Sequence, residues 1–375
     1  GASGAASMGE AADAQSFIEQ ALIEVVAHEV GHTLGLRHNF KGSAAYSLSE
    51  LSEPGRTSLT ASVMDYTAPM VPSDRAKQRQ YYSTSVGAYD HWAIRYGYTV
   101  VEGEVSGEQH PLLAEIAAEG ASRRELAFAT DEDHPRSDGV DPTASTWDMS
   151  SDPVAFFTDR LALAQKLLST AAERTVLPGE SWTRQAHAVD EFMRAALLAG
   201  SYVAKHLGGY VFSRGHRGDA GAAPPVVPVD ASAQVRALSL ALQVVTQSFW
   251  LPAAAAAARM PRHVGFGTAG TPCGESASLD EYCLGLGPPS LVRRAAKIRK
   301  LVLLQLVQPQ RLSGLAEHEW EVEQGGLSTA AVDEPGGGDD AAQWETPPAA
   351  VGSSVGGGEE GAEAAEWAAA LEGSP

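Results

Sequence analysis

The chain is poor in cysteine and has no long apolar run. Its 375 residues include two cysteines, Cys273 and Cys283, and neither belongs to a C-x-x-C pair. This argues against a zinc site built from cysteine thiolates, and leaves the pair as a disulfide in an oxidising compartment or two free thiols in a reducing one. No stretch of eighteen apolar residues occurs, so we expect no membrane-spanning helix.

Positive charge is also scarce. The 27 Lys and Arg residues face 47 Asp and Glu residues, which gives a formal net charge of −20 and argues against nucleic acid or an anionic membrane as partner. Residues 326–375 contain ten acidic residues and no Lys or Arg. Such a segment, rich in Gly, Ala and Glu, buries too little apolar surface to offset its ordering entropy. We therefore predict a disordered acidic tail over residues 325–375.

Against this background, residues 28–38 read His-Glu-Val-Gly-His-Thr-Leu-Gly-Leu-Arg-His, with the spacing H-E-x-x-H-x-x-G-x-x-H. His28 and His32 are four residues apart, so a helix places them on one face, one turn above the other. Gly35 can adopt a positive φ and end the helix, which lets His38 reach the same ion from outside it. Three imidazoles leave one position of a tetrahedral Zn²⁺ open, as in catalytic sites. The pattern predicts Zn²⁺ as cofactor, with His28, His32 and His38 as its ligands.

Glu29 supplies the reactive carboxylate of this motif. It lies one step round the helix from His28, where it can contact a water molecule bound to the metal. Zinc lowers the pKa of such a water to roughly 7, so that Glu29 can take its proton while the ion polarises a scissile carbonyl. Hydrolysis of a peptide bond is the natural use of this arrangement. The remaining histidines, His91 and His216 among them, are expected to be ordinary core or surface residues.

Local signals predict mainly helices. Ser16 to Glu19 fits a capping box at the start of a metal-binding helix over residues 16–34. Further helices are expected over residues 87–98, ended by Gly97, and from Asp152 and Pro153 onward. Others are expected over residues 181–207, from Asp230 to before Pro252, and over residues 291–307. Residues 41–60 read as a surface loop, and Asp131-Glu132-Asp133-His134 as a solvated charge run rather than a calcium loop.

Three segments in order resemble one known family. They are Glu-Val-Gly-His-Thr-Leu-Gly-Leu-Arg-His-Asn-Phe, then Ser-Val-Met-Asp-Tyr, then Tyr-Asp-His-Trp-Ala-Ile-Arg-Tyr-Gly-Tyr. They are similar to large, mostly bacterial zinc-dependent metalloproteases of the metzincin type, whose members continue into a helical extension. The stretch Trp147-Asp148-Met149-Ser150-Ser151-Asp152-Pro153 and residues 208–219 also resemble that extension. The resemblance covers roughly residues 14–315 and implies His28, His32 and His38 as ligands, Glu29 as general base and an extracytoplasmic or secreted location.

The second of these segments carries two more residues of interest. Metzincins have a tight methionine-containing turn beneath the zinc site, and Met64 stands about 26 residues after His38, as that turn requires. The resemblance implies Met64 as this turn methionine. Tyr66 resembles the tyrosine that some metzincins, notably the astacins, hold near the metal. Its hydroxyl is expected either to donate a hydrogen bond to the developing oxyanion or to make a structural contact.

The resemblance also defines an expected organisation. We predict an α+β metzincin-like zincin that is mainly α in this chain. Residues 1–98 would form the carboxyl-terminal part of a catalytic domain, residues 99–151 a loop-rich connector and residues 152–324 a helical extension, followed by the tail. Metzincins place a twisted sheet before the metal-binding helix, and about fifteen residues, mostly Gly, Ala and Ser, precede that helix here. We therefore expect either a fragment of a longer protein or a chain that has lost the upper half of the cleft.

The sequence thus predicts a zinc metalloendopeptidase with a protein or peptide substrate. Two alternatives stay open. The chain could be a non-catalytic zinc-binding remnant whose helical region is an interaction module, or a zinc hydrolase that acts on a non-peptide amide. The sequence does not fix the oligomeric state.

Overall fold

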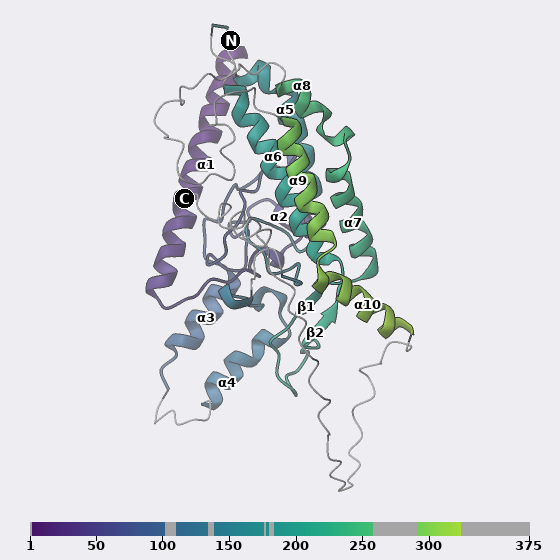
Figure 1. Cartoon of the computed structure of the whole chain (residues 1–375). Coiled ribbons are helices and arrows are strands. Elements are labelled where there is room, and N and C mark those ends of the chain that lie inside the picture. The colour runs from purple at the N-terminus through teal and green to yellow at the C-terminus, as the bar shows by residue number, and fades with distance from the viewer. Residues whose placement is uncertain are drawn as a thin grey trace. The chain divides into compact units, whose positions relative to one another are not determined.

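The computed structural model describes residues 2–101, 110–133, 139–175, 178–179, 184–257 and 291–323 (Figure 1). By their contacts, the described residues up to 257 and residues 291–316 belong to one compact unit, and the described residues after 316 belong to a second. The described part of the second unit is the end of one helix, residues 317–323. Cys273, Cys283 and the predicted acidic tail lie outside the described residues.

Helices dominate, as the sequence predicted. The longer ones are α1 (Ala2–Thr33), α3 (Ala88–Tyr98), α5 (Pro153–Thr175), α6 (Arg184–Val203), α7 (Ala231–Val245), α9 (Leu291–Leu306) and α10 (Pro309–Glu323). The shorter ones are α2 (Leu48–Leu51), α4 (Pro111–Ala118) and α8 (Leu251–Ala257). Single 3-10 turns span Ser43–Ala45, Arg75–Lys77, Glu119–Ala121, Arg124–Leu126, Asp131–Asp133, Ala204–His206 and Ser248–Trp250. Within the described residues, the sheet is a single antiparallel pair, β1 (Tyr210–Phe212) and β2 (Val226–Pro228), with Val211 opposite Val227.

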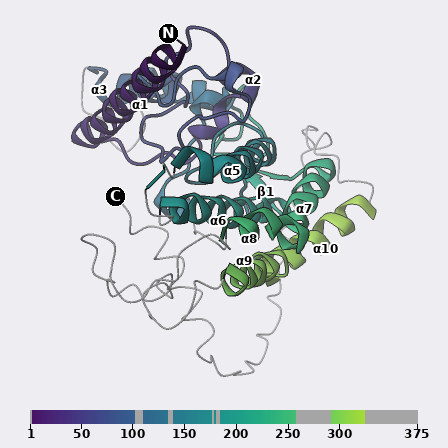
Figure 2. The ribbon, with the colours of Figure 1, turned by 90° about the horizontal axis from the view of Figure 1, so that it is seen from above.

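The main core lies among α5, α6, α7 and α9, which pack side by side (Figures 1 and 2). Phe157 and Phe192 are almost fully buried there. Gly200 allows α6 and α9 to pack closely, because a Cβ at this position would meet Val302 Cγ2 at 2.4 Å. Leu59 and Met70, from the first hundred residues, belong to the same core cluster. Packing thus joins the segment that follows the metal-binding motif to the helical bundle, and the predicted boundaries at residues 98, 151 and 324 stay predictions.

The helix α1 begins earlier in the chain than predicted. The capping box predicted at Ser16 is wrong, because the helix already runs from Ala2. The alanine-rich stretch before Ser16 contains no proline and therefore favours helix. The Ser16 hydroxyl accepts a hydrogen bond from the Gln20 side chain, one turn later, at 2.8 Å. The predicted end of this helix is correct to within one residue.

Polar side chains on one side of α1 form hydrogen bonds with residues 67–83 and hold the helix in place. The Gln20 side-chain oxygen accepts from the backbone N–H of Tyr81 at 2.6 Å. The partly buried Glu24 carboxylate accepts from the Thr67 hydroxyl and the Ser83 N–H, both at 2.8 Å. Another side carries exposed aliphatic side chains, with Leu22 and Val26 each 60% exposed, and forms with α3 an apolar groove of about 670 Å³.

Two segments expected to be loops are more ordered and more buried than predicted. Residues 41–60, predicted as a surface loop, contain α2, with a capping box between Ser47 and Glu50. They also contain buried polar residues such as Ser43. Residues 139–151, in the predicted connector, are irregular, yet Asp148 and Met149 are almost fully buried. Hydrogen bonds between residues far apart in sequence stabilise both segments. Because such bonds depend on the tertiary fold, they cannot be predicted from the local sequence.

The other predicted helices are present, but several of them end at other residues than predicted. Asp152 caps α5 by accepting from the Ala155 N–H at 3.0 Å, and Gly208 follows α6 with a φ of 57°. The predicted helix end at Gly97 is wrong, because α3 continues through Gly97 to Tyr98. The helix that starts after Asp230 ends at Val245 rather than before Pro252. The helix α4, in the segment predicted as a loop-rich connector, and the helix α10 were not predicted.

Among the described residues, no single helix is long and apolar enough to cross a membrane. The pair formed by residues 231–245 and 248–255 passes that test when taken together, but its two helices are bent by 63° at their break.

Candidate metal centre

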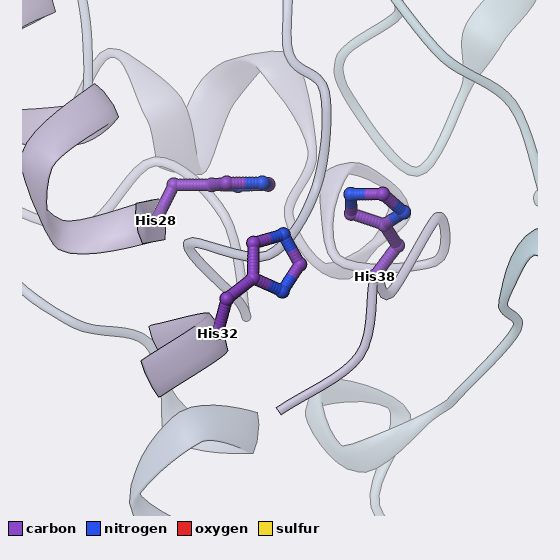
Figure 3. Close-up of side chains that lie close together, drawn as sticks. All are labelled: His28, His32 and His38. Atoms are coloured by element: carbon purple, nitrogen blue, oxygen red, sulfur yellow. The ribbon is translucent and has the colours of Figure 1, made fainter. Parts of the chain in front are cut away.

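Three histidines converge at the carboxyl-terminal end of α1. His28 and His32 project from successive turns of the helix, and His38 returns toward them from the chain that follows (Figure 3). One ring nitrogen of each lies within 4.8 Å of those of the other two. The ring centroids are 4.8 Å apart for His28 and His32, and 4.9 Å apart for His32 and His38. The structure therefore brings together the three residues that the sequence predicted as ligands.

The turn at Gly35 explains how His38 reaches this cluster. Gly35 has a φ of 85°, the left-handed conformation that glycine adopts without strain. The Gly35 N–H donates to the His32 carbonyl and the Leu36 N–H donates to the Gly31 carbonyl, both at 3.0 Å. These two bonds form a Schellman motif, which ends α1 and reverses the chain. The predicted role of Gly35 in ending the helix is confirmed.

Each histidine uses Nδ1 for a hydrogen bond to the protein. The acceptors are the Val63 carbonyl at 2.8 Å for His28 and the Leu36 carbonyl at 3.0 Å for His32. For His38 the acceptor is Asp131 Oδ1, at 2.8 Å. Because a carbonyl or carboxylate oxygen only accepts, Nδ1 carries the proton in each ring and the lone pair is on Nε2. The three rings are therefore fixed in the tautomer that binds a metal through Nε2.

Burial adjusts the charge of the first ligand. His28 is buried, and desolvation lowers its pKa, although its hydrogen bond to the Val63 carbonyl and the nearby Glu29 carboxylate act in the opposite direction. A lowered pKa favours the neutral imidazole at pH 7, which is the form that binds a metal.

The Met64 side chain lies directly under the metal-binding helix. It is fully buried, and a Cβ on Gly31 of α1 would meet its sulfur at 2.3 Å. The Met64 carbonyl accepts from the Asn39 N–H at 3.0 Å. We name residues 62–66 the Met64 turn; its Val63 carbonyl orients His28. This turn therefore contacts both the helix that carries two of the histidines and the chain that carries the third.

Asp90, in the first turn of α3, fixes the Met64 turn. Its carboxylate accepts from the Ser62 hydroxyl at 2.6 Å, from the Val63 N–H at 2.9 Å and from the Gly87 N–H at 2.7 Å. Burial raises the pKa of Asp90, and these three hydrogen bonds oppose that effect. The sequence reading assigned this residue to a helix but gave it no part in the site.

Tyr66 and Glu29 lie beside the cluster. The Tyr66 hydroxyl donates a hydrogen bond to His38 Nε2 at 2.8 Å, and its ring stacks on that of His28 at a centroid distance of 5.3 Å. This position agrees with both roles left open for Tyr66, an oxyanion contact and a structural one. Glu29 is exposed on α1 next to His28.

Two residues near the metal centre, Asp131 and Trp147, were not predicted to be part of it. Asp131, assigned to a solvated charge run, contacts His38, and the neighbouring Glu132 pairs with Arg37 at 2.7 Å. The ring of Trp147 stacks on that of Tyr66, with centroids 6.2 Å apart and planes 15° apart. The sequence shows both the acidic run and the family resemblance around Trp147. However, neither feature has a characteristic distance in sequence from the histidine motif, so the sequence alone does not predict that they lie at the site.

Other predicted candidates lie elsewhere. His91 is on α3 and lines the apolar groove beside α1. His216 is exposed, and its backbone N–H donates to Asp219 Oδ2 at 2.8 Å. Among the described residues, the three-histidine cluster is the one group that could hold a metal ion.

The chain was compared with family models, curated proteins and solved structures. The model of a protein family described as Met-zincin matches residues 10–332. No curated protein and no solved structure matches the chain.

Proposed function

Because the chain belongs to the Met-zincin family, which implies a zinc-dependent metallopeptidase, we propose that it is an endopeptidase with Glu29 as general base. The observation that carries this proposal is the shared state of the three histidines. Each donates its Nδ1 proton to a fixed acceptor, which leaves the lone pair of each ring on Nε2, and one ring nitrogen of each histidine lies within 4.8 Å of those of the other two. Structural histidines have no need of a common tautomer.

Zinc fits this donor set. Neutral imidazoles are preferred ligands of Zn²⁺, and three of them leave a coordination position open. His28, His32 and His38 would hold the ion. When bound, Zn²⁺ supplies Lewis acidity, which acidifies a water molecule and polarises a carbonyl group. The oriented acceptors behind the rings, one of them the charged Asp131, support the same assignment, since such contacts increase the basicity of the ligands.

Glu29 and Tyr66 have complementary roles in this proposal. The Glu29 carboxylate accepts the proton of the attacking water and then transfers it to the leaving amine. The Tyr66 hydroxyl, beside His38 Nε2, donates a hydrogen bond to the oxyanion that forms on the scissile carbonyl. Met64 takes no part in proton transfer. Its side chain packs against Gly31 of α1 and thereby helps to fix the positions of His28 and His32.

A substitution of Glu29 tests the proposal. We expect the Glu29→Ala variant to bind one equivalent of zinc, as the wild type does, and to cleave peptides at least about a hundredfold more slowly, because general base catalysis is lost. Metal analysis gives the zinc content, and digestion of a broad peptide library gives the rate. Glu19→Ala is the matched control, since Glu19 is an exposed carboxylate of the same helix and bonds only to Gln15 in the described part of the chain.

Three results would contradict the proposal. Unchanged cleavage by Glu29→Ala would remove Glu29 from the mechanism. A wild-type chain that binds zinc but cleaves no peptide would favour the non-catalytic zinc-binding alternative. Cleavage of non-peptide amides alone would place the enzyme in another substrate class.

A further inference from the structure

Trp147 has an unusual backbone conformation. Its φ is 58°, in the left-handed region that residues other than glycine rarely adopt, and Ser150, three residues later, has a φ of 86°. A bulky residue in this region is strained, and such strain persists only where the surrounding structure enforces it. Positions of this kind cluster at binding and catalytic sites.

Hydrogen bonds and burial on both sides of Trp147 enforce this conformation. The Trp147 N–H donates to the Tyr66 carbonyl at 2.6 Å, and the Ser150 N–H donates to the Ser43 carbonyl at 3.1 Å. The Ser43 hydroxyl donates to Asp148 Oδ1 at 3.0 Å. Asp148 and Met149 are almost fully buried, whereas the Trp147 side chain is 43% exposed. Residues 147–150 thus bury the side chains of Asp148 and Met149 in the protein interior and expose the indole of Trp147 at the surface.

The exposed indole lies one aromatic ring away from the metal centre. It stacks on Tyr66, and the Tyr66 ring is centred 4.6 Å from the His38 ring. A residue that only supported Tyr66 from behind could be buried and unstrained. Trp147 instead has a strained backbone and an exposed ring, and it stacks on Tyr66, whose ring contacts that of His38. Support of Tyr66 alone does not explain these three features together.

We propose that Trp147 forms the wall of a substrate subsite that binds an apolar side chain, preferentially an aromatic one, adjacent to the scissile bond. The inference rests on the proposed peptidase function. An indole offers a flat, rigid and uncharged surface, which binds aromatic rings by stacking and aliphatic groups by excluding water. Because the ring is anchored to Tyr66, a side chain bound against it holds the neighbouring peptide bond close to the three histidines.

Glycine is the most informative substitution, since it adopts a positive φ without strain and removes the ring while the turn is retained. The zinc-loaded wild type, Trp147→Gly and Trp147→Phe would be compared on peptides that differ only in one residue beside the cleaved bond, either Phe or Gly. We expect Trp147→Gly to lower kcat/KM for the Phe peptide at least about tenfold more than for the Gly peptide, because the stacking contact is lost. Trp147→Phe should recover most of the preference. Trp320→Ala removes another exposed tryptophan, 55% exposed on α10, and should leave both rates unchanged.

A second measurement is independent of turnover. In a Glu29→Gln background loaded with zinc, the same peptides bind without being cleaved, and calorimetry gives their Kd. Trp147→Gly in that background should weaken binding of the Phe peptide about tenfold and change binding of the Gly peptide little. Thermal unfolding of Trp147→Gly and Trp147→Phe should each show a single cooperative transition, which separates the loss of the subsite from the loss of the fold.

The outcomes separate this inference from the function on which it rests. If the wild type cleaves peptides and Trp147→Gly lowers all rates by the same factor, Trp147 only positions Tyr66 and the subsite is refuted. An unaltered preference in Trp147→Gly refutes it as well. If the zinc-loaded wild type cleaves nothing, the peptidase proposal fails and the subsite inference fails with it.

Discussion

At the scale of single residues, the acceptors behind the three histidines differ in charge. Val63 and Leu36 offer neutral carbonyls, whereas Asp131 offers a carboxylate to His38. His38 is also the ligand that does not lie on α1, so its position depends on contacts made after the turn at Gly35. A charged acceptor both orients the ring and increases its basicity. The third ligand is therefore the one most dependent on a distant side chain.

Replacing Asp131 should weaken zinc binding. We expect Asp131→Ala to lower zinc affinity by roughly 10- to 100-fold, the usual effect of losing such an acceptor, and Asp131→Asn to lower it less, since an amide oxygen still accepts from Nδ1. Competition with a chromophoric chelator measures the affinity. Glu132→Gln is the control, because Glu132 is exposed and pairs with Arg37 rather than with a histidine. Equal affinity in Asp131→Ala and the wild type would show that the turn alone positions His38.

At the scale of elements, local signals were sufficient for the motif and the helix boundaries that depend on single residues. Gly35 ends α1, and Asp152 caps α5, as predicted from residue type. The β1–β2 hairpin, the buried turn around Ser43 and the contact of Asp131 with His38 were not predicted. Their partners lie far apart in sequence, and Asp131 is 93 residues from His38. Residue type and spacing report local geometry, so a site assembled by such contacts can be read from sequence only in part.

The contact between α1 and the Met64 turn gives a prediction at this scale. A Cβ on Gly31 would meet Met64 Sδ at 2.3 Å, closer than such contacts occur in proteins. Gly31→Ala should therefore force α1 and the turn apart and destabilise the protein by about 1–3 kcal/mol, the usual cost of overpacking. It should also weaken zinc binding, because His28 and His32 move relative to His38. Urea unfolding and chelator competition measure the two effects.

Gly97 provides the matched control for Gly31. It is also a helical glycine, but a Cβ there meets nothing within 4 Å, and its φ is not positive. Gly97→Ala should be neutral or stabilising by up to about 1 kcal/mol, since alanine favours helix. If Gly31→Ala is as stable as Gly97→Ala, the packing of α1 on Met64 is looser than the structure indicates.

At the scale of the whole molecule, a buried network of charges lies behind the Met64 turn. Lys41 pairs with Asp141 at 2.8 Å, and the Lys205 ammonium donates to the Ala144 carbonyl at 3.1 Å. Burial raises the pKa of Asp148 to about 6 and lowers that of Lys205 to about 8. Asp65, next to Met64, is also buried, and burial together with the nearby Asp148 raises its pKa well above the ordinary value. Burial and the nearby negative charge of Asp148 both favour the protonated form of the Asp65 carboxyl.

This proton makes stability depend on pH. Because the pKa of Asp65 is higher in the folded chain than its ordinary value of 3.8, the folded chain binds the proton more tightly than the unfolded chain does. The resulting stabilisation is full below that ordinary value and is lost as the pH rises through the folded pKa, by at most about 1.4 kcal/mol per pH unit. Asp65→Asn cannot titrate, yet its amide oxygen can still accept from the Ser43 N–H, which now bonds Asp65 Oδ2 at 2.7 Å. The stability of Asp65→Asn minus that of the wild type should therefore increase from pH 5 to pH 8. Urea unfolding of both proteins at one zinc concentration measures this difference, because the other titrating groups and the bound metal cancel. A difference that stays constant, or that decreases with pH, would mean that Asp65 is charged in the folded protein.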